Sequence, residues 1–131
     1  MYLLTRLRSR RKKRCKNKEI IALANLLLMK DDLYLDSTLK CSRVAQGIGS
    51  NRTYLWAALH KLGPGFQGYL ARFRIIYFIK HAQEFAFLPK GEIAERCGFT
   101  HEKYLNKYLK NMFGMTLSEY LKIIRRERLP T

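Results

Sequence analysis

The hydrophobic residues of the chain recur at helical spacing, three and four positions apart, in nearly every segment after residue 18. The first stripe predicts a helix over residues 19–29 and consists of Ile20, Leu23, Ala24, Leu27 and Leu28. An unusually apolar segment predicts one long helix over residues 66–84, and Thr116 with Glu119 has the capping-box spacing that begins a last helix. No strand signal rises above background. The pattern therefore predicts an all-α fold of about seven helices.

Two stretches follow the same plan of a short apolar helix, a glycine and a second, amphipathic helix. In the first stretch the apolar face ends at Gly49, and Ser50 or Asn51 can cap the helix that follows. In the second stretch residues 92–97 end at Gly98, and a helix rich in polar and basic residues begins at once. This order is the helix-turn-helix layout.

The two stretches align as copies of each other. At an offset of 49 residues, Ala45 pairs with Ala94 and Gly49 with Gly98. At an offset of 50 residues, the matched pairs are Tyr54 with Tyr104, Leu55 with Leu105 and Leu59 with Leu109. The change of offset predicts a duplication with one residue inserted in the turn.

The second helix of the second copy has one apolar and one basic face. Its predicted inner face consists of Leu105, Tyr108, Leu109 and Met112, and its outer face of Lys103, Asn106, Lys107 and Lys110. An amide can bracket adenine, and lysines can reach guanine or phosphate, so this face suits a helix that enters the major groove of DNA. A merely solvated face is the alternative, because nearly any helix has a polar side.

The matching helix of the first copy is less typical. Its outer face consists of Arg52, Thr53, Trp56, Ala57 and His60. Trp56 either contacts thymine methyl groups or a sugar, or packs against the long apolar helix. Packing is preferred here because a tryptophan usually has apolar neighbours. His60 is expected to be a polar surface residue rather than a ligand or a base.

The charge of the chain points to a polyanionic partner. The formal net charge is +16 and the pI is about 10.1, which favours nucleic acid first and an anionic membrane surface second. Residues 1–18 are expected to be a basic, disordered arm, which is either a solvated tail or a contact to DNA backbone or membrane. No stretch approaches the ~20 apolar residues of a membrane span. We therefore expect a cytoplasmic protein, or the cytoplasmic part of a longer membrane-anchored regulator.

Cysteines and histidines show no pattern of a metal site. The three cysteines include no C-x-x-C pair, and the three histidines lack the i, i+4 spacing of a helical metal pair. Cys41 and Cys97 lie on apolar faces beside the turns, where packed, unreactive thiols are expected. No nucleophile, acid/base pair or phosphate loop is found, so we expect no enzyme activity, cofactor, metal or small-molecule site.

With both turns and the long helix in place, the sequence resembles the DNA-binding domain of the AraC/XylS family of bacterial transcription regulators, over about residues 33–125. The most specific segment is residues 93–122, IAERCGFTHEKYLNKYLKNMFGMTLSEYLK. It is close to the family signature of I-A-x-x-x-G-F, an aromatic-rich recognition helix and G-x-T-P-x-E-Y. The resemblance implies a domain over residues 19–131 with subdomains at about 19–64 and 88–126, joined by a rigid helix at about 66–84.

The resemblance also implies roles for single residues. The base-facing positions fall on Thr53, Trp56 and Ala57 in the first recognition helix and on Glu102, Lys103, Asn106 and Lys107 in the second. The expected backbone contacts are Ser50, Asn51, Arg52, Thr100, His101 and Lys110, and the expected turn glycines are Gly49, Gly98 and Gly114.

Three departures from the family pattern matter. Trp56 and Ala57 stand where polar or basic residues are usual, so base reading by the first subdomain is open. Leu117 replaces the signature proline, which should weaken the start of the last helix modestly. Phe78 replaces a small residue in the long helix, so the core around it has to repack.

These features predict a sequence-specific DNA-binding transcription regulator that reads two successive major-groove segments with two recognition helices. The alternative is a nonspecific basic DNA- or RNA-binding protein on the same fold. Double-stranded DNA is the expected partner, with RNA polymerase as a further contact, and the N-terminal arm leaves an anionic membrane surface open.

Overall fold

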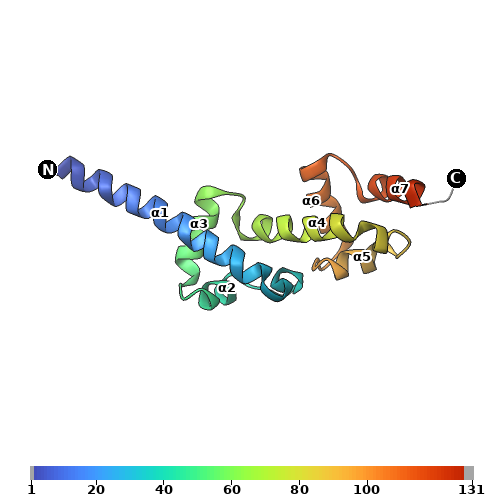
Figure 1. The fold of residues 1–131 in the computed structure, drawn as a ribbon, viewed down its shortest axis with the longest axis horizontal. Helices are drawn as coiled ribbons and strands as arrows, with labels where there is room; N and C mark the ends of the chain where they lie inside the picture. The colour runs from blue at the N-terminus through green and yellow to red at the C-terminus, as the bar shows by residue number, and fades with distance from the viewer. Residues whose placement is uncertain (1, 129–131) are drawn as a thin grey trace. The chain divides into compact units, whose positions relative to one another are not determined.

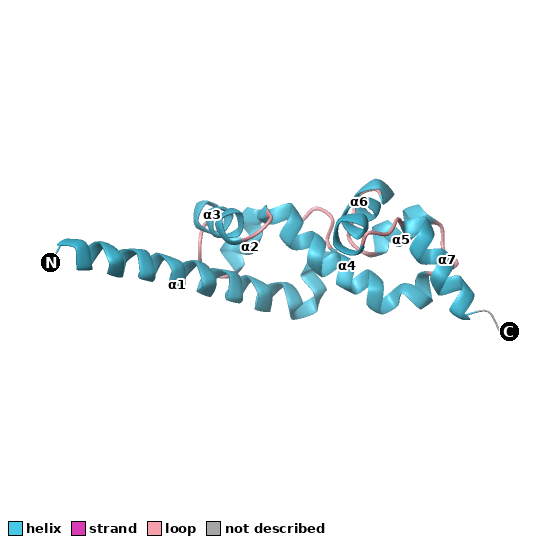
Figure 2. Ribbon diagram, turned by 90° about the horizontal axis from the view of Figure 1, so that it is seen from above, coloured by secondary structure: helices cyan, strands magenta, loops and turns pink. Residues whose placement is uncertain are grey.

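The computed structural model describes residues 2–128; for residues 2–15, Leu62 and Arg128 it describes the backbone alone. The described residues form seven α-helices and one 3-10 helix and contain no strand (Figures 1 and 2). This confirms the prediction of an all-α fold of about seven helices. In order, the elements are α1 (Tyr2–Met29), η1 (Lys30–Leu35), α2 (Cys41–Gly47), α3 (Arg52–Leu62), α4 (Gly65–Phe85), α5 (Lys90–Arg96), α6 (Glu102–Phe113) and α7 (Leu117–Arg128).

Helix α1 begins at Tyr2, 17 positions earlier than the expected start at residue 19. The segment expected to be a disordered arm is therefore helical in the structure. Leucine, arginine and lysine are all strong helix formers, and α1 contains no glycine or proline that would end it sooner. Helix α1 ends where Asp31 and Asp32 adopt left-handed backbone angles, with φ of 58° and 51°. No helix within residues 2–128 is long and apolar enough to cross a membrane.

The chain divides into two compact units. The first unit contains the residues up to Leu33 together with Thr38–Tyr69. The second contains Tyr34–Ser37 together with the residues from Leu70 onward, so it includes a short segment that precedes α2 in the sequence. Helix α4 supplies its first five residues to the first unit and the remainder to the second.

The core of the first unit forms where α1 meets α2 and α3. Helix α1 contributes Ile20, Ala24 and Leu28 to this core, and all three are buried. Leu23 does not follow the expected stripe, because 43% of its surface is exposed. A close approach of helices explains Gly47 in α2, since a Cβ there would lie 2.6 Å from Leu27 Cδ2.

The core of the second unit surrounds α4. Ile75 and Phe78 are fully buried there, and the Phe78 ring packs 5.4 Å from the ring of Tyr120 in α7. The larger Phe78 ring is thus accommodated by direct packing against the last helix, α7. Ile76, on the same apolar run of α4, is 48% exposed.

The segment Tyr34–Ser37 is held in the second unit by a buried cation. Arg74 is 5% exposed, and its Nε donates to the carbonyl oxygen of Tyr34 at 2.7 Å while Nη2 donates to that of Asp36 at 3.0 Å. The guanidinium also lies over the ring of Phe99, 5.6 Å from its centroid. Burial lowers the pKa of Arg74, and the charge of Asp36 opposes this shift.

Candidate nucleic-acid interface

Both turns have the same backbone hydrogen bonds. The amide of Ser50 donates to Ala45 O at 2.8 Å, and in the second copy the amide of Phe99 donates to Ala94 O at 2.9 Å. The amide of the turn glycine donates to the carbonyl three residues earlier at 3.1 Å in both copies. The predicted turn glycines are confirmed, since Gly49, Gly98 and Gly114 have φ of +72°, +91° and +70°.

The helix after each turn begins with a side-chain cap. Asn51 Oδ1 accepts a hydrogen bond from the amide of Tyr54 at 3.0 Å and so begins α3. His101 Nδ1 accepts from the amide of Lys103 at 3.1 Å and begins α6. Asn51 and His101 lie 50 positions apart, one more than the turn glycines, which places the inserted residue between glycine and cap.

The inner faces of α3 and α6 attach the two helices to their cores. Leu55 and Leu105 are both fully buried, as expected for matched positions of a duplication. Leu59 and Leu109 are likewise buried, while Tyr54 and Tyr104 are both exposed. One inner-face prediction is wrong: Met112 is 38% exposed, because it lies in the last turn of α6, beyond the residues that pack on the core.

The outer face of α6 is basic and accessible. Lys103, Lys107 and Lys110 are exposed along it, whereas Glu102 and Asn106 are half-buried. The ammonium of Lys103 lies 5.1 Å from the ring centroid of Tyr104. Such a contact holds a long side chain along the helix surface without removing its charge from solvent. Thr100, just before α6, is exposed as well.

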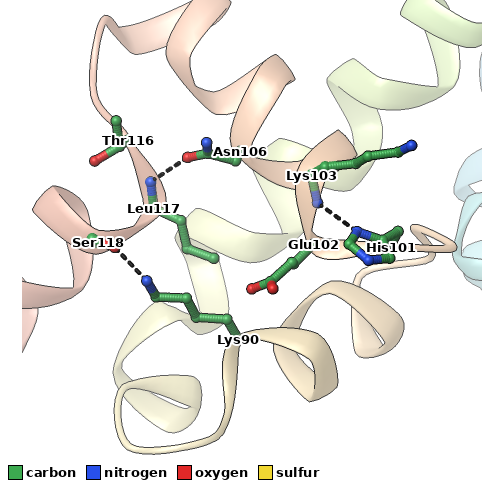
Figure 3. Close-up of a pocket in the computed structure, with 8 residues that line it drawn as sticks. All are labelled: Lys90, His101, Glu102, Lys103, Asn106, Thr116, Leu117 and Ser118. Carbon is green, nitrogen blue, oxygen red and sulfur yellow. Dashed lines mark hydrogen bonds between the residues drawn. The ribbon is translucent and has the colours of Figure 1, made fainter.

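Asn106 makes a contact within the fold that the sequence pattern did not predict. Its Oδ1 accepts a hydrogen bond from the backbone amide of Leu117 at 2.8 Å. Figure 3 shows this side chain reaching from α6 to the start of α7. The predicted Thr116 cap is confirmed next to it, since Thr116 Oγ1 accepts from the amide of Glu119 at 3.2 Å.

These residues border a cleft of about 450 Å³ beside α6 (Figure 3). Its lining comes from α5, α6 and the start of α7, and Lys90 Nζ donates to Ser118 Oγ. Sequence reasoning missed Lys90, because a contact between residues 28 positions apart leaves no local pattern. The residues that line the cleft are Lys90, His101, Glu102, Lys103, Asn106, Thr116, Leu117 and Ser118.

The outer face of α3 presents an aromatic ring in place of a row of cations. Trp56 remains 41% exposed, so any packing against the long helix leaves much of its ring accessible. Its ring lies 4.2 Å from that of His60, and the Arg52 guanidinium is 5.3 Å from its centroid. His60 Nδ1 bonds to the Trp56 carbonyl oxygen at 2.9 Å. Thr53 and Ala57 are exposed on the same face.

The two described cysteines are buried, one in each unit. Cys41 is 4% exposed and Cys97 is fully buried. Burial raises the pKa of the Cys97 thiol to about 12, and it raises that of Cys41 too, against an opposing effect of Arg52. Both thiols are thus protonated and shielded at neutral pH.

Comparison with known proteins shows to which family this arrangement of helices belongs. The family model described as a helix-turn-helix domain, of the AraC type, matches residues 44–123, which contain both turns together with α3 and α6. The chain belongs to the AraC-type helix-turn-helix family. Members of this family are DNA-binding transcription regulators, so double-stranded DNA is the partner of this AraC-type domain. No curated protein matches the chain.

Solved structures with the same fold are similar to this AraC-type domain. The C-terminal domain of AraT, a response regulator from Geobacillus stearothermophilus, is 26% identical, with a TM-score of 0.58 over 86% of this chain and 88% of that one. The C-terminal domain of the two-component response regulator yesN from Fusobacterium nucleatum is 24% identical, with a TM-score of 0.57 over 76% and 95%. A DNA-binding transcriptional dual regulator from Escherichia coli K-12 shares the fold at 15% identity, with a TM-score of 0.61 over 82% and 93%.

Proposed function

We propose that this domain is a sequence-specific reader of DNA, with α3 and α6 each entering a segment of major groove. The outer face of α6 is the observation that carries the proposal. Lys103 and Lys107 are exposed there, one helical turn apart, while Leu105 on the opposite side is fully buried. A helix anchored on one side and basic on the other can place its side chains at base edges without moving from its core.

The polar residues on and beside α3 and α6 differ in the part of DNA that they can contact. Lys103 and Lys107 can donate to the O6 and N7 atoms of guanine, and Glu102 can accept from the amino group of cytosine. Lys110, Arg52, Thr100 and the backbone near Ser50 can bind phosphate oxygens. The capping side chains of Asn51 and His101 orient the first amides of α3 and α6.

The first recognition helix has a different chemistry. Trp56 and Ala57 offer apolar surface, which can contact thymine methyl groups but supplies few hydrogen bonds. Arg52 lies beside the Trp56 ring at the start of α3, where it can reach the DNA backbone. We therefore assign most of the base reading to α6, with α3 contributing backbone and methyl contacts.

A double lysine variant tests this function. We expect Lys103→Ala with Lys107→Ala to reduce affinity for the best DNA site at least tenfold, since each base contact is worth about 1–3 kcal/mol. The measurement is selection of bound genomic fragments at near-physiological salt, followed by titration of the selected site. Lys80→Ala with Lys122→Ala is the matched control, because it removes two exposed lysines of the second unit that belong to α4 and α7 instead of α6.

The same experiment distinguishes a sequence reader from a nonspecific basic binder. A sequence reader gives a recurrent motif that only the α6 double variant loses. A nonspecific binder gives an operator-to-random affinity ratio near one, and both double variants then lose affinity equally through weaker phosphate contacts.

We further propose that α1 binds an anionic membrane surface. Leu23, Leu26 and Met29 form an exposed apolar stripe on α1, with 43%, 68% and 65% of their surfaces accessible. Lys16 and Lys18 are exposed one to two turns before it, and residues 1–18 contain nine lysines and arginines but no acidic residue. An apolar stripe beside a dense basic run is the composition of a helix that lies at a lipid surface.

Vesicle binding tests the α1 proposal. Leu26→Glu with Met29→Glu is expected to reduce binding to vesicles with anionic lipid at least tenfold, because it places charge where apolar contact is proposed. Ile76→Glu with Ile123→Glu adds the same charge at exposed positions of the second unit and should bind more tightly than the α1 variant. Equal loss in both variants, or no binding by the unaltered chain, contradicts the proposal.

A further inference from the structure

We propose that Asn106 is a positioning residue that fixes the start of α7, rather than a residue that reads a base. This inference rests on the proposed DNA-reading function and changes which side chains of α6 perform it. The observation is the 2.8 Å bond from the Leu117 amide to Asn106 Oδ1, between residues 11 positions apart on different helices.

The bond provides an acceptor for the Leu117 amide, which has no partner within its own helix. The first amides of an α-helix have no intrahelical acceptor. In α7, Asn106 accepts from Leu117 and Thr116 accepts from Glu119, so two of these donors are occupied by side chains. The Leu117 side chain is 2% exposed, which places this contact at the edge of the core.

The same bond holds the Asn106 side chain in a direction that works against adenine reading (Figure 3). An asparagine that brackets adenine uses Oδ1 as the acceptor for N6 and Nδ2 as the donor to N7. In this protein Oδ1 already accepts from a backbone amide, and the side chain is half-buried and directed at α7. Turning this side chain away from α7 toward a base would cost the hydrogen bond to Leu117.

Base reading and positioning of α7 are therefore carried out by different residues of α6. Lys103 and Lys107 lie three positions before and one after Asn106 and are both exposed, so the base-reading chemistry falls to them. Asn106 instead sets the first turn of α7 relative to α6, and with it one wall of the cleft in Figure 3.

Removing the donor instead of the acceptor provides the test. Leu117→Pro deletes the amide hydrogen, and proline is well tolerated at the first position of a helix. Leu117→Ala is the matched control, because it keeps the amide and loses more of the buried side chain. Each variant is compared with and without Asn106→Ala by selection of bound DNA. Hydrogen exchange of the amide at position 117 is measured in the unaltered and Leu117→Ala proteins, with and without Asn106→Ala.

In the unaltered chain, Asn106→Ala should speed exchange of the Leu117 amide at least about tenfold and leave the selected motif unchanged. In the Leu117→Pro protein, freed Asn106 should add an adenine preference of at least about fivefold at one position. Adding Asn106→Ala should remove that preference, and Leu117→Ala alone should not create it.

Two results would overturn the inference. One is loss of an adenine preference when Asn106→Ala is made in the unaltered chain. The other is an exchange rate at Leu117 that does not respond to Asn106→Ala. The exchange measurement needs no DNA, so it separates failure of this inference from failure of the proposed function, which would appear as the absence of any motif.

Discussion

Replacing Gly98 with alanine is expected to destabilise the second unit by about 3 kcal/mol, whereas the same change at Gly49 should cost the first unit only about 1 kcal/mol. Both glycines have positive φ, and that strain is the common part of the cost. The difference in cost comes from the space that is available to a Cβ atom at each position. A Cβ on Gly98 would lie 2.9 Å from Tyr34 O, Leu35 Cα and Arg74 Nε, while a Cβ on Gly49 meets nothing within 4 Å.

Urea unfolding of the two variants tests this difference. The backbone atoms of Tyr34 and Leu35 cannot move aside as a flexible side chain could, so Gly98→Ala should displace the whole segment Tyr34–Ser37. Far-UV circular dichroism follows both units, and fluorescence of the single Trp56 follows the first unit alone. Equal losses for the two alanine variants would show that crowding at Gly98 contributes nothing.

Arg74→Leu should destabilise the second unit by about 3 kcal/mol, because hydrogen bonds from a charged donor contribute about 1.5–3 kcal/mol each and two are lost. The gain from no longer burying a cation offsets part of the sum. The loss remains large because the carbonyl oxygens of Tyr34 and Asp36 lose their charged donor.

Arg72→Leu is the matched control for this prediction. Arg72 lies two positions earlier on α4 and is exposed, so its loss should change the free energy of unfolding by less than about 0.5 kcal/mol. Arg74→Lys should fall between the two, since one ammonium cannot reproduce the fork of the guanidinium at two carbonyls. An Arg74→Leu protein as stable as the Arg72→Leu protein would refute a structural role for the buried cation.

The features that sequence reasoning predicted correctly are local ones. The positive φ of Gly49 and Gly98, the Thr116 cap and the bounds of α4 each follow from the residue types within a few positions. Periodicity predicted which side of a helix is apolar, but it could not tell how far a neighbouring helix covers that side. For this reason periodicity places Leu23 and Met112 on apolar faces although both are exposed in the structure.

The features that sequence reasoning missed join residues far apart in the chain. Arg74 binds a segment 38 and 40 positions earlier, and Asn106 binds an amide 11 positions later. The sequence pattern predicts a base-reading role for Asn106 because its place on the outer face of α6 is a local property. Its bond to α7 depends on the path of the chain after α6, which the sequence pattern does not specify.

Because each unit contains one buried thiol, the opening of the two units can be followed separately by thiol labelling. A thiol reagent can attack Cys41 or Cys97 only when the surrounding helices separate, because both side chains are shielded and protonated. In a chain with Cys15→Ser, labelling would therefore proceed in two phases, one for each unit. The two rates would report how often each unit opens around its own thiol.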